Sequence, residues 1–230
     1  YVDEYGVNWG SGIKIGEIVW APVNCGYHVT DYKYGKLYQW GRKYGQGYYG
    51  NLYIDDTVKS YGDARSPSIV WGPVGSATGN DATNANVFYK ASATYNYNWC
   101  DPQDDGLWNS GTETEPVKTE NDPCPKGWRV PTVKELKYLY QNKSSFTVDE
   151  AGQRGIWLSG EEPFSENASV VFFPAAGLRY GDDAYATERG RQGEYWSSQS
   201  GSILSIRDAY CGMASTYSLA CGYSVRCVQE

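Results

Sequence analysis

Six cysteines constrain this 230-residue chain more than any other feature of its sequence. They form no Cys-x-x-Cys pair, and His28 is the only histidine. A zinc site needs thiolates and imidazoles at short spacing, so we predict no metal site and no cofactor. Disulfide bonds are the favoured interpretation and imply an oxidising compartment, whereas six reduced thiols in a cytosolic protein are the alternative. The cysteines are Cys25, Cys100, Cys124, Cys211, Cys221 and Cys227.

Composition and charge narrow the class of protein. Apolar residues make up 40% of the chain and charged residues 20%, with 27 Gly and 22 Tyr, which is typical of an ordered, strand-rich and loop-rich fold. The net charge of −7 repels phosphate backbones and anionic membranes, so we predict no nucleic-acid partner. The longest mostly apolar run, residues 169–178, is shorter than the ~20 residues of a membrane-spanning helix. We expect a secreted or surface-exposed location, with any signal or anchor missing from this sequence.

One segment has the pattern of a helix, which we predict over residues 132–142. Thr132 and Glu135 have the spacing of a capping box, and an apolar stripe at helical spacing follows through Leu136 and Leu139. Short β-prone runs bounded by Gly, Asn, Asp or Pro predict strands at residues 14–20, 155–158, 169–173, 195–198, 203–207 and 223–228.

The domain organisation is simple. No repeat of 20 to 50 residues occurs, so we expect a single domain over residues 1–230, in which residues 1–12 are an N-terminal extension or the remnant of a longer chain. Two stretches, residues 26–63 and 71–123, have weak periodicity and many Gly, Tyr, Asn and Asp residues. We predict long, ordered, irregular loops there, of the kind that carry function.

An ordered series of motifs resembles a known family. Asp122-Pro-Cys-Pro-Lys-Gly-Trp-Arg-Val-Pro-Thr132 leads into the predicted helix, and Phe173-Pro-Ala-Ala-Gly-Leu-Arg179 and Gly222-Tyr-Ser-Val-Arg-Cys-Val228 follow. Ile18-Val-Trp-Ala-Pro-Val-Asn24 belongs to the same series, together with Tyr38-Gln-Trp-Gly41 and Tyr195-Trp-Ser-Ser198. The series covers most of residues 13–229. It resembles the Fibrobacter succinogenes major paralogous domain family of exported proteins in gut bacteria.

The resemblance implies an α+β fold of C-type-lectin-like type, with small antiparallel sheets, one helix and long loops. It also implies a place on bacterial surface proteins, including adhesin-like and fimbrial tip components. The chain lacks the Glu-Pro-Asn, Gln-Pro-Asp and Trp-Asn-Asp motifs of sugar-binding C-type lectins, so calcium-bridged sugar binding is not expected. We assign structural roles to four motif residues. Trp128 and Trp196 are expected to pack in the core, and Arg129 and Arg226 to donate hydrogen bonds to carboxylates or backbone carbonyls.

Six cysteines allow fifteen disulfide pairings. The resemblance implies Cys124–Cys227, because the lectin-like fold brings its last strand back beside the helix-bearing segment. Cys211 and Cys221 bracket a hairpin-like segment, so we pair them across two neighbouring strands. Cys25–Cys100 follows by elimination.

The sequence offers little for catalysis. The sequence has no Gly-x-Ser-x-Gly motif that could supply a nucleophilic serine for His28. Adjacent carboxylates such as Asp55-Asp56 usually point apart and do not indicate a glycosidase pair. We therefore predict that the chain is not an enzyme. The acidic turn at residues 101–109 lacks calcium-loop spacing and is interpreted as an Asx-rich turn, with a calcium site as the alternative. The related fold hosts formylglycine-generating oxidases with paired reactive cysteines, which makes a redox enzyme of that type a third functional hypothesis.

Aromatic residues are the strongest functional signal, with 22 Tyr and 9 Trp in the chain. Tyrosines among small polar residues are typical of recognition loops, because they add contact area and a hydroxyl at low entropic cost. We predict a non-catalytic recognition module that binds a glycan or a surface protein, and a structural fimbrial subunit associated with other fimbrial subunits is the runner-up. Packing of these aromatics on one another is the competing interpretation. The candidate ligand-binding residues are Tyr34, Trp40, Tyr44, Tyr48 and Tyr49.

Overall fold

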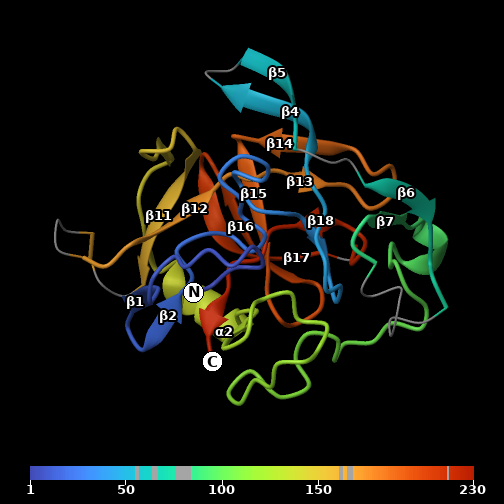
Figure 1. Cartoon of the computed structure of the whole chain (residues 1–230), viewed down its shortest axis with the longest axis horizontal. Coiled ribbons are helices and arrows are strands. Elements are labelled where there is room, and N and C mark those ends of the chain that lie inside the picture. Colours follow the sequence, from blue (N-terminus) through green and yellow to red (C-terminus); the bar gives the residue numbers. More distant parts are fainter. Residues whose placement is uncertain (55–56, 64–66, 76–83, 161–162, 165–167, 217) are drawn as a thin grey trace.

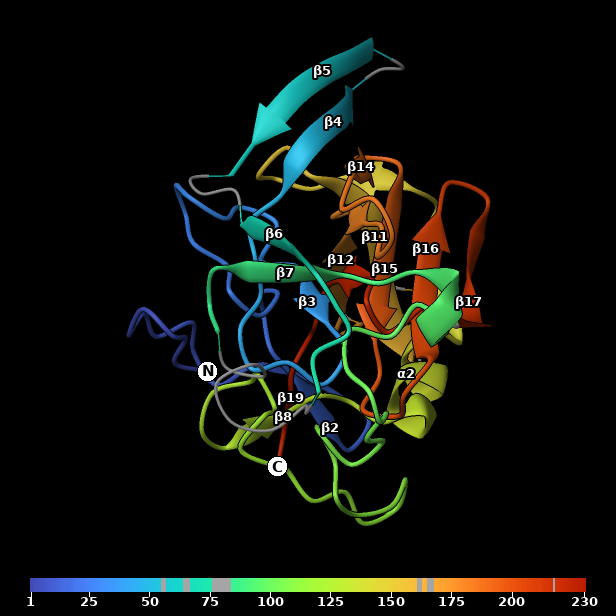
Figure 2. The same ribbon diagram turned by 90° about the vertical axis from the view of Figure 1, so that its right-hand side faces the viewer.

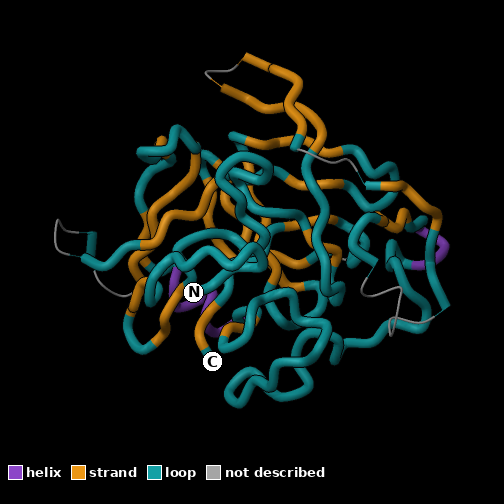
Figure 3. Tube along the Cα trace, in the orientation of Figure 1, coloured by secondary structure: helices purple, strands orange, loops and turns teal. Residues whose placement is uncertain are grey.

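The computed structural model describes residues 1–54, 57–63, 67–75, 84–160, 163–164, 168–216 and 218–230. It is an α+β protein of small sheets with one short α-helix, 39% strand and 4% helix. Loops connect the strands over much of the chain (Figure 3). Among the described residues, no helix is long and apolar enough to cross a membrane.

A four-stranded sheet joins both ends of the chain. Its order is β1-β2-β19-β8, so the last strand is inserted between the second strand and the strand before the helix. The N- and C-termini therefore lie near each other (Figure 1). The strands are β1 (Ile13–Ile15), β2 (Ile18–Trp20), β8 (Trp128–Arg129) and β19 (Val228–Gln229).

A six-stranded sheet has the order β3-β18-β13-β14-β4-β5 and extends away from the body as the β4–β5 hairpin (Figure 2). β4 runs parallel to β14 and antiparallel to β5. The strands are β3 (Tyr38–Gln39), β4 (Tyr49–Ile54), β5 (Thr57–Gly62), β13 (Leu178–Arg179), β14 (Ala186–Arg189) and β18 (Gly222–Tyr223).

Three further sheets lie within the described residues. In the first, β11 (Arg154–Gly160) pairs with β9 (Asn142–Lys143), β10 (Thr147–Val148) and β12 (Val171–Pro174). In the second, β16 (Ser202–Arg207) pairs with β15 (Gln192–Trp196) and β17 (Tyr210–Ser215). In the third, β6 (Ser68–Trp71) runs parallel to β7 (Val87–Lys90), and a 3-10 helix follows at Ala93–Tyr95.

The α-helix, α2 (Val133–Leu139), has the predicted capping box but ends earlier than predicted. The Thr132 side chain accepts the backbone N–H of Glu135, and the Glu135 carboxylate accepts that of Thr132. Leu136 and Leu139 are buried in the core. The helix does not continue to residue 142, because Asn142 forms part of β9 and pairs with β11.

The predicted strands lie in strand regions, with two corrections. Residues 14–20 form two strands rather than one, because the chain turns back at residues 16–17 and Ile13 pairs with Trp20. Residues 223–228 contain the end of β18 and the start of β19, which belong to different sheets. The stretch at residues 26–63, expected to be irregular, contains β3 and the β4–β5 hairpin.

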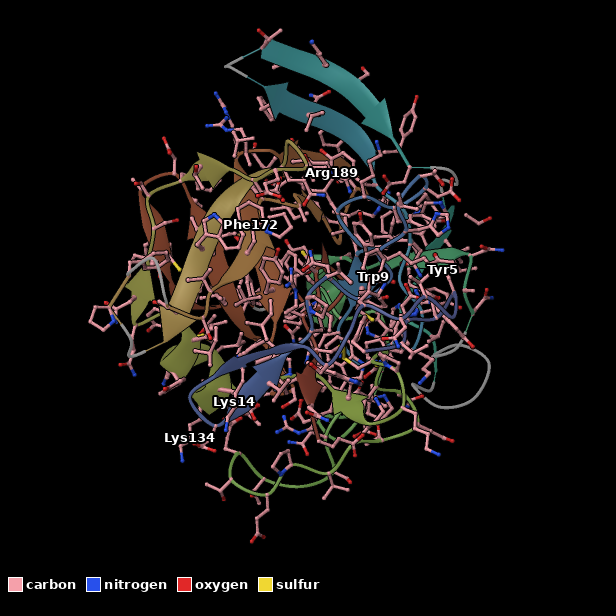
Figure 4. All side chains as sticks on the ribbon, turned by 60° about the vertical axis from the view of Figure 1, so that its left-hand side comes forward. Tyr5, Trp9, Lys14, Lys134, Phe172 and Arg189 are labelled. Carbon is pink, nitrogen blue, oxygen red and sulfur yellow. A yellow bond between two sulfur atoms is a disulfide. The ribbon has the colours of Figure 1, made fainter. Side chains whose placement is uncertain are left out.

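Residues 1–12 pack against the rest of the fold. The Tyr1 ring meets the Trp128 ring edge-on, with centroids 5.1 Å apart. The Asp3 carboxylate accepts the backbone N–H of Tyr5 and Val7 and the indole N–H of Trp9, at 2.7 to 2.9 Å. Figure 4 shows this segment, marked by the Tyr5 and Trp9 labels, lying against neighbouring strands and loops.

The Cys124–Cys227 disulfide is present, and it joins the segment before β8 to the segment before β19. The other two predicted pairings are wrong. Cys211 lies opposite Ile206 in the β16–β17 ladder and packs in one core cluster, whereas Cys221 precedes β18 and packs in another. All four remaining cysteines are buried free thiols: Cys25, Cys100, Cys211 and Cys221.

Candidate binding surface

The structure separates the five predicted ligand-binding residues into two groups. Tyr49 is 64% exposed and Tyr44 is 39% exposed, as a binding role requires. Trp40, Tyr48 and Tyr34 are buried, so for these three the binding interpretation is corrected to packing. Their large apolar rings and hydrogen-bonding tips are satisfied inside the fold.

Each buried aromatic has interior partners. The Trp40 indole N–H donates to the Ser197 carbonyl at 3.1 Å, and its ring packs against Trp108. The rings of Tyr48 and Tyr34 lie 3.9 Å and 4.7 Å from the Arg189 guanidinium carbon. These aromatics therefore order the interior beneath the β4–β5 hairpin rather than face solvent.

Arg189, at the end of β14, anchors the base of the hairpin. Its guanidinium makes a two-pronged, fully buried ion pair with Asp63, with N–O distances of 3.0 and 3.3 Å. The Asp63 carboxylate also accepts the Tyr48 backbone N–H at 2.6 Å. Asp63 follows β5 and Tyr48 precedes β4, so one arginine holds both ends of the hairpin. Figure 4 shows Arg189 at the base of this hairpin.

Gly50 allows the hairpin to lie directly on β14. A Cβ atom at this position would lie 1.7 Å from the Ala186 carbonyl oxygen. Only glycine permits so close an approach of two backbones. The consequence is that Tyr49 and Asn51, on either side of Gly50, both project from the opposite face of β4.

The turn at residues 180–185 is fixed by a second buried arginine. The Arg179 guanidinium donates to the Ala184 carbonyl at 2.6 Å and to the Gly47 carbonyl at 2.8 Å, which ties the turn to the approach to β4. The Asp183 carboxylate accepts the Tyr185 backbone N–H at 2.7 Å. Burial lowers the pKa of Arg179 to about 10, so it stays charged at neutral pH.

A hollow of about 440 Å³ lies between the β4–β5 hairpin, the start of β6 and this turn. We call it the tyrosine hollow. Tyr49 and Tyr185, 64% and 46% exposed, are its aromatic residues, and Ile69 adds an exposed aliphatic one. The described residues that line it are Tyr49, Gly50, Asn51, Ser60, Pro67, Ile69, Arg179, Asp183, Ala184 and Tyr185.

The tyrosine hollow offers aromatic rings next to amide, hydroxyl and carboxylate groups. Asn51 and Ser60 face each other across the hairpin, and neither side chain is hydrogen-bonded to another described residue. Asp183 contributes a carboxylate from the facing turn. A few placed polar groups on an apolar floor are typical of sites for small polar ligands. Because the walls are fixed by strand pairing and buried arginines, little ordering is needed when a ligand binds.

The four residues assigned to structure lie in or against the core. Trp128 and Trp196 are buried, and the Trp196 indole N–H donates to the Tyr38 carbonyl at 2.7 Å. Arg129 forks onto the Glu135 carboxylate at 2.6 and 2.8 Å. Arg226, fully buried, donates to the Asn24 side chain and to the carbonyls of Ala21 and Phe172 at 2.9 to 3.0 Å.

The remaining sequence candidates, His28 and the acidic turn at residues 101–109, do not line the tyrosine hollow. The His28 imidazole interacts with Thr30 and Asp31 of its own turn, at 3.1 and 3.3 Å. In the acidic turn, the Asp104 carboxylate accepts the Gly106 N–H, as in an Asx-turn. Within the described part of the chain, metal-ligating side chains gather in one place, at three cysteines of which two form the disulfide.

Sequence reasoning missed Tyr185, Ile69 and Asp183. Tyr185 and Asp183 lie in a short turn more than 130 positions after Tyr49, and only the parallel pairing of β4 with β14 brings them together. The one available signal is that Asp182-Asp183 and Tyr185 follow Arg179, a pattern of turn residues around an exposed aromatic. No family model, curated protein or solved structure matches this chain.

Proposed function

We propose that this chain is a non-catalytic recognition module of a bacterial cell surface, of C-type-lectin-like type, that binds carbohydrate in the tyrosine hollow. The observation that carries the proposal is the pair of exposed tyrosines, Tyr49 and Tyr185, set beside Asn51, Ser60 and Asp183 in an open hollow. The apolar face of a sugar ring packs on tyrosine, and its hydroxyls pair with amide, hydroxyl and carboxylate groups.

Two further observations support a surface location and a neutral ligand. The Cys124–Cys227 disulfide fits an oxidising compartment. The net charge of −7, with Asp183 at the hollow, disfavours nucleic acids and other polyanions as ligands. Among the described residues that line the hollow, Arg179 is the only cation, and its Nη1 and Nη2 groups donate to the backbone carbonyls of Ala184 and Gly47.

The test is a glycan array probed with the purified chain, followed by titration of any hit. Tyr49→Ala and Tyr185→Ala are each expected to weaken binding about tenfold or more, equivalent to about 1.4 kcal/mol. Stability should change by less than about 0.5 kcal/mol, because both rings are at the surface. Tyr210→Ala is the matched control, since Tyr210 is 47% exposed on β17 in a different sheet. Equal binding by Tyr49→Ala and wild type would exclude the tyrosine hollow as the site.

A second candidate, a structural subunit of a surface appendage, is favoured by β6. Its residues are all exposed, including Ile69, Val70 and Trp71. The N–H groups of Ser68 and Gly72 donate toward β7, so the backbone groups of Ile69 and Trp71 point away from it. An edge of this kind can pair with an extended strand of a partner. If the wild-type chain binds none of the host and microbial glycans on the array, this candidate is favoured.

A further inference from the structure

Three sulfur atoms meet at a place that shares no residue with the tyrosine hollow. The Sγ atoms of Cys25, Cys124 and Cys227 all lie within 4.8 Å of one another, and all three residues are buried. Cys124 and Cys227 form the disulfide, and Cys25 is a free thiol beside it. Thiol–disulfide exchange starts from this arrangement, in which a thiol lies next to a disulfide.

The main chain holds Cys25 beside Cys227. The Cys25 N–H donates to the Val225 carbonyl, and the Ala21 N–H donates to the Cys227 carbonyl, both at 2.9 Å. Residues 21–25 therefore run alongside residues 225–227. The proximity of the two sulfurs is part of the backbone pairing of the fold and does not depend on a long side chain.

A second hollow, of about 390 Å³, reaches Cys25 and Cys124, whereas Cys227 is not among the residues that line it. We call it the cysteine hollow. Lys118 lines its wall and donates to the Cys124 carbonyl at 2.8 Å. Lys43, also in the wall, donates to the Asp122 carbonyl at 2.7 Å. Ammonium groups in the wall of the hollow that Cys124 lines favour a thiolate at Cys124 over one at Cys227, which does not line it.

We propose that Cys25, Cys124 and Cys227 form a disulfide-exchange site, in which exchange releases Cys124 from its disulfide as a reactive thiol. The Cys25 thiolate attacks the Cys227 sulfur, the Cys25–Cys227 bond forms, and the Cys124–Cys227 bond breaks. Cys124 leaves as a thiolate and takes up the proton that Cys25 gave up, so one disulfide and one thiol are conserved and no oxidant or reductant is needed. The thiol now faces the cysteine hollow, where a low-molecular-weight disulfide can react with it.

The surroundings of Cys25 set how fast exchange occurs. Burial raises the pKa of the Cys25 thiol to about 12, and the Tyr38 hydroxyl, which donates to the sulfur at 3.3 Å, partly opposes this rise. Exchange is therefore slow at neutral pH and accelerates about tenfold per pH unit as the thiolate fraction grows. The titratable groups around it are Tyr1, Glu4, Lys36, Tyr38, Lys43 and Asp122.

The experiment traps the released Cys124 thiol with iodoacetamide, without any reductant, between pH 7 and 10, under conditions in which the fold is stable. Peptide mapping should show alkylated Cys124 together with a Cys25–Cys227 disulfide, at a rate that rises about tenfold per pH unit. Cys25→Ser should give no alkylated Cys124. Cys100 is the internal control for unfolding, because it is also a buried free thiol with its pKa raised to about 12.

Three results would overturn the proposal. They are alkylation of Cys25 with Cys124–Cys227 intact, no alkylation of Cys124 by pH 10, and alkylation of Cys124 at the same rate as Cys100. A second variant covers the case in which Cys25→Ser does not fold. Cys124→Ser, treated with oxidised glutathione, should form a Cys25–Cys227 disulfide, and two free thiols at those positions would contradict the exchange geometry.

Discussion

At the scale of single residues, Arg189 anchors the base of the β4–β5 hairpin, which forms one wall of the tyrosine hollow. It pairs with Asp63, donates to the Ala176 carbonyl at 3.2 Å and lies over the rings of Tyr34 and Tyr48. A buried ion pair of this kind is costly to break from one side, because the remaining charge has no water to solvate it. Arg189 therefore supports the binding surface without touching a ligand.

Arg189→Met is expected to lower the free energy of unfolding by about 3 to 5 kcal/mol, since it leaves the Asp63 carboxylate buried and unpaired. Urea denaturation measures the change. Lys14→Met is the matched control, because Lys14 forms an exposed pair with Glu17 whose loss should cost less than about 1 kcal/mol. Similar losses in the two variants would mean that the Arg189–Asp63 pair does not anchor the hairpin.

At the scale of elements, the parallel pairing of β4 with β14 positions the β4–β5 hairpin. Gly50→Ala places a methyl group 1.7 Å from the Ala186 carbonyl oxygen, so the two strands must separate. We expect a loss of about 1 to 3 kcal/mol in the free energy of unfolding, as for overpacked sites. Hydrogen exchange should accelerate at β4 and β14. Gly75→Ala is the control, because its Cβ would meet no atom of the described residues within 4 Å, and unchanged exchange in Gly50→Ala would contradict the close approach.

The elements differ in how far the sequence could predict them. The start of α2 could be predicted from its capping box, because both residues of the box lie within one helical turn. The β4–β5 hairpin was expected to be irregular, since Gly50 and Asn51 break any apolar alternation in β4. Its order comes from β14 and from Arg189, which lies 126 positions after Asp63. Aromatic content predicted a tyrosine-based site, but only tertiary contacts separate exposed Tyr49 from buried Tyr48.

At the scale of the whole molecule, one sheet connects the two ends of the chain. β19 pairs with β2 on one side and β8 on the other, so the beginning, middle and end of the sequence share one sheet. The Cys124–Cys227 disulfide crosses the same junction and closes a sequence separation of 103 residues. The two pairings that proved wrong assumed that nearness in sequence, or elimination, decides which cysteines meet. Cys25 instead lies beside this junction, because residues 21–25 run alongside residues 225–227 and place its sulfur within 4.8 Å of those of Cys124 and Cys227.

The disulfide should contribute strongly to stability, because it restricts a long segment of the unfolded chain. For a loop of this length the entropic contribution is about 4.7 kcal/mol, and native disulfides typically contribute about 2 to 5 kcal/mol. Cys124→Ala/Cys227→Ala should therefore unfold at a lower urea concentration, with a loss of about 3 to 5 kcal/mol. The double variant is needed because a single substitution leaves Cys25 beside the remaining partner.

Dithiothreitol provides the matched comparison for this last prediction. Reductant should lower the stability of the wild-type chain to that of the double variant, and it should leave the double variant unchanged. Cys211→Ala, which removes a buried thiol that forms no disulfide, should keep its response to reductant. If wild type and the double variant unfold at the same urea concentration without reductant, strand pairing alone closes the junction, since the covalent bond then adds nothing beyond the β2–β19–β8 ladder.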